Sequence, residues 1–518
     1  MDEYLEFFAE HEANKKVFNT AGLCIKSKHY MVNVDNKIKN IIKLVQSDAY
    51  FVINRPRQYG KTTTLNRLEK ILKTRYKVVS LDFEGLGNVF ESEQSFCRYF
   101  INYINSSLEL DLPVIFKFLD LINIIKKITD DTDIILIIDE AFKASNNKLF
   151  LDFLGMLRSL YLSRAKGDSN TFKSVILAGV YDIKNLKIKF RDDTDVRYNS
   201  PWNIAVKFDV DMSFNEYEIG TMLSEYSKEN KLNFDIEDLS TEIYKFTSGY
   251  PFLVSRICQI IDEDILINRD SVWNKTHIQK AIKILLEENN TLFDDLIKNM
   301  ENNNKLYEYM YNLLILNVTS IFNIDNPIIN LGVMFGYLSK DHNNNTIVSN
   351  KIIRERIYNY LVSKTDSKVM SSYNFKDNFI TENDGLDIEK ILLRFQQFMK
   401  ENYSIRDTEF LERHGVLLFL SFIKPIINGV GFDYKEVQIS EERRLDIVIQ
   451  YNHNKYVIET KIWHGNIAHQ KGLKQLKNYL DIEGLDKGYL LIFNFNKNKE
   501  YINEKYSIEE KEIFEIIV

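Results

Sequence analysis

Residues 53–65 read INRPRQYGKTTTL, and the triplet Gly60-Lys61-Thr62 is what the end of a phosphate-binding loop requires. Such a loop holds phosphates with backbone N–H groups and a helix N-terminus, while its lysine and hydroxyl meet the terminal phosphates and Mg²⁺. An apolar run before it (49–54) predicts a strand, and the run after it (63–74) has helical spacing. This context favours a nucleotide site over a chance match, although Arg55 stands where a glycine is expected.

The second half of a nucleotide site is a carboxylate at the end of a buried strand. The stretch ILIIDEA supplies Asp139 for the Mg²⁺ shell and Glu140 to polarise the attacking water. An Asp-Glu pair can also simply cap the following helix. Because the four residues directly before Asp139 are all aliphatic, the strand-end interpretation is the stronger one, and the two motifs support each other.

Strand and helix signals alternate over the first two hundred residues. Further strand candidates are 76–83, 133–139 and 174–180, and the unbroken run DIILIID at 133–139 is typical of a strand buried on both faces. This alternation predicts a parallel α/β sheet.

From residue 211 the pattern becomes helical, with helices predicted at 213–230 and in the segment 246–261. Residues 332–362 predict strand, polar turn, strand and helix, which is the order of a winged-helix unit. The polar stretch 363–378 is the linker candidate. The predicted fold class is thus α/β and multidomain: a P-loop core at 15–210, a helical lid at 211–285, a winged-helix region at 286–362, a linker at 363–386 and a C-terminal domain at 387–518.

Several motifs of the first part resemble those of the AAA-like bacterial ATPases related to the STAND class. They are KHYMV (28–32), NRPRQYGKTTTL, LIIDEA, SPWNIA (200–205) and SGYPFLV (248–254). The resemblance covers about residues 15–370. It implies ATP and Mg²⁺ as cofactors, with Asp139 and Glu140 as the acidic pair. It also implies that the nucleotide meets Arg57, Gln58, Gly60, Lys61, Thr62 and Thr63, and that Thr62 joins the Mg²⁺ shell.

Two parts of a vigorous ATPase cannot be assigned from the sequence. Tyr181 and Asp182 are weak candidates for a γ-phosphate sensor, and Arg191 or Arg197 for an arginine finger; structural or surface roles are favoured for all four. The Gly-Tyr-Pro of SGYPFL predicts a helix entry with proline in the first turn. In STAND-like relatives such a turn lies near the nucleotide.

The C-terminal part contains ERRLDIVIQYNHNKYVIETKIW (442–463), two alternating apolar runs around an Asn-rich turn, which predicts a β-hairpin. Counting in from the turn brings Asp446, Glu459 and Lys461 to one patch of the sheet. Two carboxylates and a lysine suit metal-assisted phosphodiester hydrolysis, because the carboxylates hold Mg²⁺ and the lysine orients the nucleophile. Charges that only solvate an exposed hairpin are the alternative.

The elements around this hairpin make the first interpretation stronger. A helical stretch with Glu412 and a strand (431–440) precede it, and a helix with Gln475 and a strand (488–495) follow. The ordered set resembles the PD-(D/E)XK nuclease fold over about residues 387–518, although Leu445 replaces the usual proline. This resemblance implies metal binding by Asp446, Glu459 and Glu412, and catalysis by Asp446, Glu459, Lys461 and Gln475. The catalytic residue that the ATPase resemblance implies is Glu140.

Other polar residues of this domain are interpreted as surface residues. His453, His464 and His469 lack the regular spacing of a zinc site. The basic residues around Gln475, which are Lys471, Lys474 and Lys477, could meet phosphates, but a solvated helix face is at least as good an explanation.

The composition limits the other possibilities. The net charge of −7 disfavours a large nonspecific nucleic-acid surface. Three scattered cysteines indicate neither a disulfide framework nor a thiolate zinc site, which fits the cytoplasm. The N-terminus lacks a signal-peptide pattern, and the longest apolar run (416–427) is too short to span a bilayer.

The leading hypothesis is an ATP-binding and ATP-hydrolysing protein that controls a Mg²⁺-dependent nuclease, with DNA favoured over RNA as the nucleic-acid partner. A role in defence against phage or mobile DNA and assembly into a homo-oligomer are further expectations by analogy. The alternative is a nucleotide-dependent switch or scaffold whose nuclease-like domain binds but does not cut. A winged-helix transcription regulator is weaker, because residues 332–362 lack an evident basic recognition helix.

Overall fold

A computed structural model of the chain describes most of its residues, and these form two compact units. The first unit runs to Asp294 and includes 322–341 and 348–353; the second contains 295–321, 342–347 and the chain from Arg354 onward. No helix within the described ranges combines the length and apolar character that crossing a membrane requires. The described residues are 16–84, 87–141, 147–179, 202–266, 272–314, 318, 320–365, 379, 381, 385–402, 415, 418–420, 422–423, 431–434, 445–451, 454–463, 465–494, 496 and 500–518.

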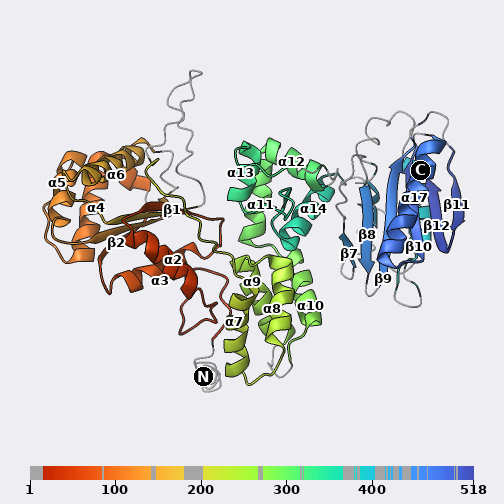
Figure 1. The fold of residues 1–518 in the computed structure, drawn as a ribbon, viewed down its shortest axis with the longest axis horizontal. Coiled ribbons are helices and arrows are strands. Elements are labelled where there is room, and N and C mark those ends of the chain that lie inside the picture. Colours follow the sequence, from red (N-terminus) through yellow and green to blue (C-terminus); the bar gives the residue numbers. More distant parts are fainter. Residues whose placement is uncertain are drawn as a thin grey trace, which may run out of the picture. The chain divides into compact units, whose positions relative to one another are not determined.

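The first unit is built on a parallel sheet whose strand order is β1-β4-β3-β2 (Figure 1). All four strands lie where the sequence predicts them, and β3 and β4 are buried at every position. Their continuous β-branched and aliphatic runs have this pattern because helices cover both faces. The strands are β1 (Tyr50–Asn54), β2 (Lys77–Asp82), β3 (Ile134–Asp139) and β4 (Ser174–Gly179).

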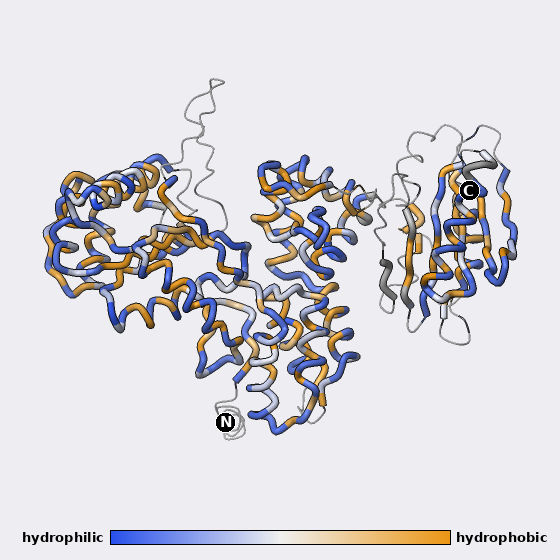
Figure 2. The backbone as a smooth tube through the Cα atoms, viewed as in Figure 1, coloured by the Kyte–Doolittle hydropathy of each residue, from blue (hydrophilic) through white to orange (hydrophobic). Residues whose placement is uncertain are grey.

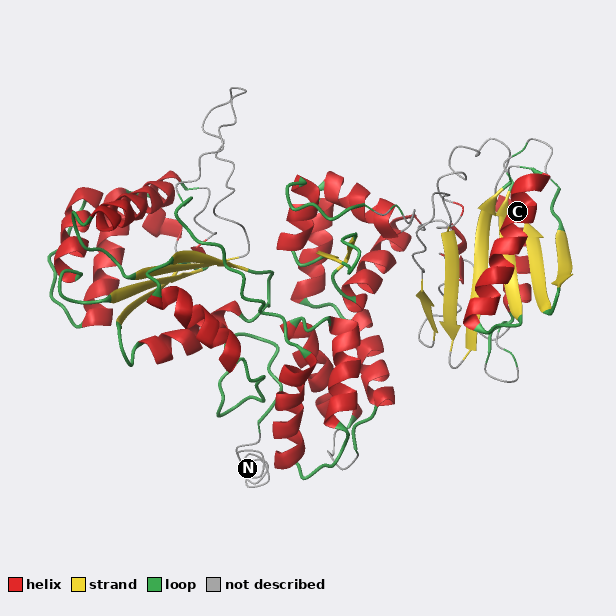
Figure 3. Ribbon diagram, in the orientation of Figure 1, coloured by secondary structure: helices red, strands yellow, loops and turns green. Residues whose placement is uncertain are grey.

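Two apolar cores lie on opposite faces of this sheet. Alternate strand residues face α2 (Asp35–Gln46) and α3 (Lys61–Leu72) on one side. The remaining strand residues face the other side, where α4 (Glu93–Leu108), α5 (Phe118–Ile128) and α6 (Lys148–Lys166) pack, with the short η1 (Gly87–Phe90) before α4 (Figure 3). Figure 2 shows hydrophobic residues along the strands of this sheet and alternating with hydrophilic residues along the helices. This three-layer sandwich confirms the predicted parallel α/β core.

A group of helices, called the lid, follows in the same unit, and two of them lie at the positions where the sequence predicts helices. Its first helix begins at a full capping box, in which Asn215 and Glu218 satisfy each other's backbone N–H groups. Pro251 occupies the first turn of the third helix, which confirms the helix entry expected there. The lid helices are α7 (Glu216–Glu229), α8 (Ile236–Thr247), α9 (Pro251–Ile260), which runs on into the π-turn η4 (Ile261–Ile265), and α10 (Lys275–Glu287).

The elements after the lid include the predicted hairpin and helix. Strands β5 (Leu338–Lys340) and β6 (Thr346–Val348) form a two-stranded sheet, and the helix predicted to follow them is present. The helices of this region are α11 (Thr291–Glu301), α12 (Asn304–Leu314), α13 (Pro327–Met334) and α14 (Lys351–Thr365).

The second unit contains a six-stranded sheet of order β11-β12-β10-β9-β8-β7. The hairpin β8–β9 and strand β10 confirm the prediction, whereas β11 and β12 were not predicted. Helix α17 covers one face through Leu473, Leu476 and Leu480, and α15 packs on the other through Phe395 against Phe493. The elements are α15 (Ile388–Asn402), β7 (Gly431–Tyr434), β8 (Leu445–Tyr451), β9 (Asn454–Ile462), α17 (Asn466–Glu483), β10 (Lys487–Phe493), β11 (Asn503–Ile508) and β12 (Lys511–Ile517).

Candidate functional site

The predicted phosphate-binding loop joins the end of β1 to the start of α3. Gly60 takes the left-handed conformation, with φ of 75°, directly before the helix, where a side chain would add strain. Gln58 also has a positive φ, of 55°. Non-glycine residues in this conformation are uncommon and concentrate at functional sites. The loop therefore has the backbone form of a ligand cradle at the N-terminus of a helix.

Lys61 lies inside this loop rather than in solvent. Its Nζ donates to the carbonyl oxygens of Arg55 at 3.1 Å and Pro56 at 2.8 Å, and only 7% of the residue is exposed. Burial lowers the pKa of Lys61 to about 8, although the charges of Glu140 and Asp139 act in the opposite direction. An ammonium held in this way gains strongly from a nearby polyanion, which would replace the hydration that burial removed.

The structure brings the two halves of the predicted nucleotide site together. Thr62 Oγ1 donates to Asp139 Oδ2 at 2.8 Å, so the hydroxyl and carboxylate expected to share Mg²⁺ are in direct contact. Glu140 follows with φ of 50°, and its backbone N–H donates to Asp139 Oδ1 at 2.9 Å. A hydroxyl and a carboxylate oxygen at this spacing suit Mg²⁺, which prefers oxygen ligands.

Arg55, which replaces the expected glycine, points away from the loop interior. Its guanidinium donates to the carbonyl oxygens of Asn54 at 2.7 Å and Val210 at 2.6 Å and lies 5.1 Å from the centre of the Phe208 ring. Burial lowers the pKa of Arg55. The side chain fastens the strand end to the segment that leads into the lid, and the loop keeps its open form.

A cavity of about 790 Å³ lies beside the loop, between the sheet domain and the lid. Four residues expected to meet the nucleotide line it: Arg57, Gln58, Gly60 and Thr63, whereas Lys61 and Thr62 do not. Its volume is in the range of roughly 300–1,000 Å³ that is usual for small-molecule sites. Most of its wall is apolar, including Tyr30, Met31, Val32, Ile38, Ile41, Met222, Pro251 and Phe252.

Two buried polar atoms at this cavity have no hydrogen-bond partner among the described residues. They are Gln58 Oε1 and Asn290 Nδ2. Buried polar atoms are nearly always paired in proteins, so such orphans call for a ligand or water. An apolar wall, a phosphate loop at one end and unsatisfied polar atoms together fit an adenine nucleotide.

The lid and the segment after it contact the loop directly. Tyr250 donates to the backbone carbonyl of Arg57 at 2.5 Å and packs edge-on against Tyr59. Gln58 Nε2 donates to Thr291 Oγ1 at 3.0 Å. Arg256 of α9 forms a forked ion pair with Glu288, and both residues line the cavity.

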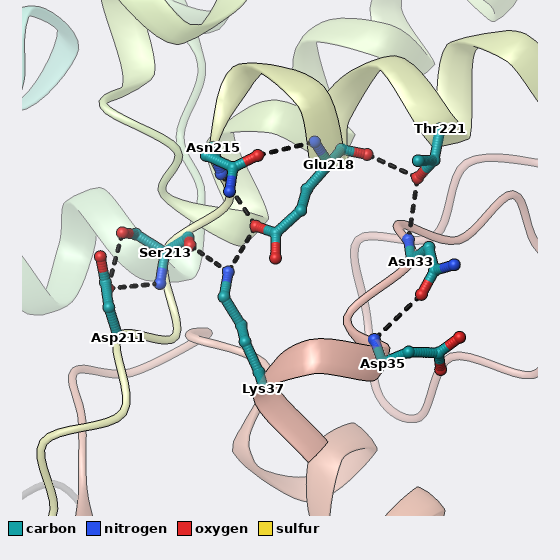
Figure 4. Close-up of polar contacts among 8 residues, drawn as sticks. All are labelled: Asn33, Asp35, Lys37, Asp211, Ser213, Asn215, Glu218 and Thr221. Carbon is teal, nitrogen blue, oxygen red and sulfur yellow. Dashed lines mark hydrogen bonds and ion pairs between the residues drawn. The ribbon is translucent and has the colours of Figure 1, made fainter. Parts of the chain in front are cut away.

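A second group of polar contacts ties the lid to the sheet domain (Figure 4). Lys37 of α2 reaches the carbonyl oxygen of Ser213 and the carboxylate of Glu218 at the start of α7. The backbone N–H of Asn33 donates to Thr221 Oγ1 at 2.9 Å. Lys37 also lines the cavity, so these contacts hold the lid at the cavity wall.

In the second unit the hairpin register places the predicted nuclease residues together. Asp446 of β8 pairs directly with Glu459 of β9, as counting from the turn predicted. Glu459 is 3% exposed, and its Oε1 lies 2.8 Å from Lys461 Nζ. This contact lacks good hydrogen-bond geometry, which leaves that oxygen able to accept from another group. A buried carboxylate with a neighbouring strand carboxylate suits divalent-metal binding.

Helix α17 covers this pair at one point. A side chain added at Gly472 would meet Lys461 at 3.5–3.6 Å, so the helix backbone passes close over the lysine stem. Gln475, one turn further on, is half-buried, and Lys471 and Lys474 are exposed. Lys477 pairs with Asp481 and Glu509. Gln475 thus lies one helical turn from the glycine that passes over Lys461, and its role at the site stays a prediction.

The structure corrects the expectation for His469, and several other predicted positions lie outside the described residues. His469 is not a surface residue: its Nε2 is bonded to Glu515 of β12, and its side chain is 11% exposed. It turns inward because α17 lies flat on the sheet over this strand. Seven residues named from the sequence lie outside the described residues: Glu412, Tyr181, Asp182, Arg191, Arg197, His453 and His464.

Sequence reasoning missed several residues at both sites. Thr291 meets the loop, and Arg256 and Glu288 line the cavity beside it; all three lie about two hundred residues further along the chain, and no local pattern marks them. Glu515 interrupts the otherwise apolar end of the strand KEIFEII and is buried. A charged residue within this apolar run was the one sequence signal that could have indicated a buried partner.

One protein-family model matches the chain. Residues 428–505 match the PD-(D/E)XK nuclease superfamily, which covers the hairpin, α17 and β10. The second unit thus has a PD-(D/E)XK nuclease-like domain, as the ordered residues predicted. No curated protein gives a significant match to the chain.

Solved structures similar to the first two thirds of the chain are ATPases and related proteins. The Walker-type ATPase PABY2304 of Pyrococcus abyssi is 12% identical, with 66% of this chain and 99% of that chain covered and a TM-score of 0.45. Cdc6p from Pyrobaculum aerophilum is 15% identical (66% and 98% covered, TM-score 0.34). The RuvB Holliday junction branch migration motor of Thermotoga maritima is 14% identical (64% and 95%, TM-score 0.33). Likenesses this distant say nothing of activity; the sheet order and loop above define the P-loop fold.

Proposed function

We propose that this chain binds and hydrolyses ATP in its first unit and uses the nucleotide state to control Mg²⁺-dependent cleavage of nucleic acid, with DNA favoured over RNA. The observation that carries the nuclease half is the register of Asp446 opposite Glu459, with Lys461 2.8 Å from Glu459. The ATP half rests on the Thr62–Asp139 contact beside buried Lys61.

The roles of the ATP-site residues follow from their geometry. Lys61 and the loop amides would bind phosphates, Thr62 and Asp139 would hold Mg²⁺, and Glu140 would orient the attacking water. Arg57, Gln58, Gly60 and Thr63 would line the nucleotide. When bound, Mg²⁺ neutralises charge on the phosphates. The membership of the STAND class that we infer rests on the quoted motifs and on the Tyr250 contact to the loop.

At the nuclease site, Asp446 and Glu459 would hold the divalent ion, with Glu412 as a further ligand. Lys461 would neutralise charge on the phosphate or orient the nucleophile, and Gln475 would position the substrate. The metal supplies an activated water and stabilises charge in the transition state. We infer that this domain cuts rather than only binds, because Glu459 is buried beside Lys461. Burying these charges costs free energy, and a bound divalent metal would offset that cost.

A control route is supported by where the chain leaves the first unit. The chain first leaves that unit after Asp294, three residues beyond Thr291, which accepts a hydrogen bond from Gln58 of the phosphate loop. Glu288, three residues earlier, is held by Arg256 at the cavity. Because phosphates would compete for the groups that hold this segment, nucleotide binding would alter the tether that leads to the second unit.

The alternative is a nucleotide-dependent switch or scaffold that binds nucleic acid or protein without cutting. The acidic net charge of −7 and the replacement of the loop glycine by Arg55 favour it.

The cellular setting that we propose is the cytoplasm, which the three free cysteines support. There the protein would act on phage or mobile DNA as a homo-oligomer.

The deciding experiment is cleavage of a DNA and RNA panel with Mg²⁺ or Mn²⁺, with and without ATP. Wild type is compared with Lys61→Ala and Glu459→Gln, and with the exposed controls Lys70→Ala and Glu510→Gln. We expect cleavage to be lost in Glu459→Gln and its ATP response to be lost in Lys61→Ala only. Tight ATP binding without cleavage of any substrate would establish the switch instead.

A further inference from the structure

His469 and Glu515 form a contact between α17 and β12 that the proposed mechanism does not use. His469 Nε2 is bonded to Glu515 Oε2, and the two side chains are only 11% and 2% exposed. Burial raises the pKa of Glu515, while the bond to His469 acts to lower it. Leaving either group alone in this environment would be strongly unfavourable, so the pair has a defined geometry.

Glu515 lies in the same row of the sheet as the candidate nuclease residues. It pairs with Leu490 of β10, Leu490 pairs with Glu459, and Glu459 pairs with Asp446. Two strand spacings, or about 10 Å, therefore separate the backbones of Glu459 and Glu515. All of these positions share the α17 side of the sheet, because each is Leu490 or lies two residues from a strand residue that packs with α17, namely Val448, Val457 or Ile513.

The contact is continuous with the site along β9. Glu459, Lys461 and Trp463 are alternate residues, so they share one side of the extended chain, and Trp463 N–H still donates to Phe493 of β10. The Trp463 ring centre lies 5.8 Å from the His469 ring centre. Three residues after His469, Gly472 passes over Lys461. Residues three apart on a helix are neighbours on its surface, so His469 adjoins the covered lysine.

The position in α17 is also suited to an anion. His469 closes the first turn of the helix, where its backbone N–H donates to the carbonyl oxygen of Gly465. Gly465, the N-cap residue, has no side chain to accept from the turn. The positive end of the helix dipole and the imidazole thus lie at the same end of the site.

We propose that His469 is a phosphate-contacting residue of the candidate nuclease site, held in orientation by Glu515. This inference rests on the proposed nucleic-acid substrate. Because Nε2 is bonded to Glu515, Nδ1 is the ring nitrogen left to contact a backbone phosphate. This phosphate would be next to the one that Lys461 contacts.

The test is the salt dependence of DNA binding, measured by fluorescence anisotropy on a labelled duplex at pH 6 in EDTA, so that no cleavage occurs. Each phosphate contact contributes about 0.9 to the slope of log K against log salt concentration. We expect His469→Gln to reduce this slope by about one and to weaken binding several-fold at low salt. His469→Arg, which places a cation at this position, should restore the slope.

A second ion pair between α17 and the sheet supplies the matched control. Lys455 of β9 is bonded to Glu483 at the far end of the helix. Lys455→Gln removes a contact of the same kind, so an equal loss of slope in Lys455→Gln would show that His469 acts only by holding the helix. Binding with an unchanged slope in His469→Gln would also overturn this inference and leave the nuclease proposal intact. An absence of DNA binding by every variant, wild type included, would overturn both.

Discussion

The side chain of Lys61 is almost fully buried, and the burial of its ammonium group has a measurable effect on stability. Its pKa is about 8 in the folded chain, against 10.5 for a free lysine, because burial disfavours the charged form. Between these values the unfolded chain binds more protons, so this group's contribution to stability rises with pH from about 8 to 10.5. Below pH 8 the buried ammonium destabilises the nucleotide-free protein.

We therefore expect Lys61→Met to raise the free energy of unfolding at pH 7 by about 1–3 kcal/mol. The gain is limited because the carbonyl oxygens of Arg55 and Pro56 lose their donor. Urea unfolding at pH 7 and pH 10 measures it, and the difference from wild type should shrink at the higher pH. ATP with Mg²⁺ should stabilise wild type but not the variant.

Lys70→Met, in the exposed part of the same helix, is the control and should change stability little. A Lys61→Met protein that is less stable than wild type at pH 7 would show that the two carbonyl bonds outweigh the desolvation of the ammonium.

Substitutions at Gly472 test how closely α17 packs over Lys461 and Glu459. A methyl group there would lie 3.5 Å from Lys461 Cε, an ordinary contact, so Gly472→Ala should be tolerated and should stabilise the helix by up to about 1 kcal/mol. Gly472→Leu should displace Lys461 from Glu459 and reduce cleavage at least about tenfold. Cleavage rates and melting temperatures measure both effects.

Asn478→Leu, on the exposed side of α17, is the matched control for the leucine substitution. Full activity of Gly472→Leu would mean that Lys461 need not lie on Glu459 for cleavage.

At the scale of elements, the sequence predicted what local patterns encode. The run 133–139 reads as apolar at almost every position because helices cover both faces of β3, and the hairpin register follows from counting in from the Asn-rich turn. Strand β12 escaped prediction because Glu515 breaks its apolar pattern; the reason for that carboxylate, His469 on another element, is not local. The cavity likewise combines residues from 19 to 291, which no sequence window contains.

The segment between α10 and α11 offers a test at this scale. If nucleotide binding competes with Thr291 for Gln58, Thr291→Val should raise ATP affinity about fivefold, since one neutral hydrogen bond contributes about 1 kcal/mol. Titration of a fluorescent ATP analogue measures this. Thr276→Val, at an exposed position of α10, is the control. Weaker binding by Thr291→Val would place this hydrogen bond in the nucleotide-bound state instead.

At the scale of the whole molecule, the proposed control route predicts a response at the exit from the first unit. Addition of a slowly hydrolysed ATP analogue with Mg²⁺ should speed hydrogen exchange several-fold in residues 291–301, because the groups holding Thr291 and Glu288 are drawn to the phosphates. Exchange in α6, on the far face of the sheet, should not change. An ATP-dependent nuclease with unaltered exchange in 291–301 would require another route.

The strand order of the first sheet has a consequence for synthesis of the chain. β4 lies between β1 and β3, and Arg55, the first residue of the phosphate loop, donates its N–H to Gly179 at the end of β4. Residue 179 is added 119 residues after Gly60, which at 5–20 residues per second corresponds to roughly 6–24 s of translation. During that interval β1 lacks its partner strand, so its unpaired backbone and apolar side chains are exposed and available for chaperone binding. The nascent loop thus becomes competent for nucleotide only after the ribosome has passed β4.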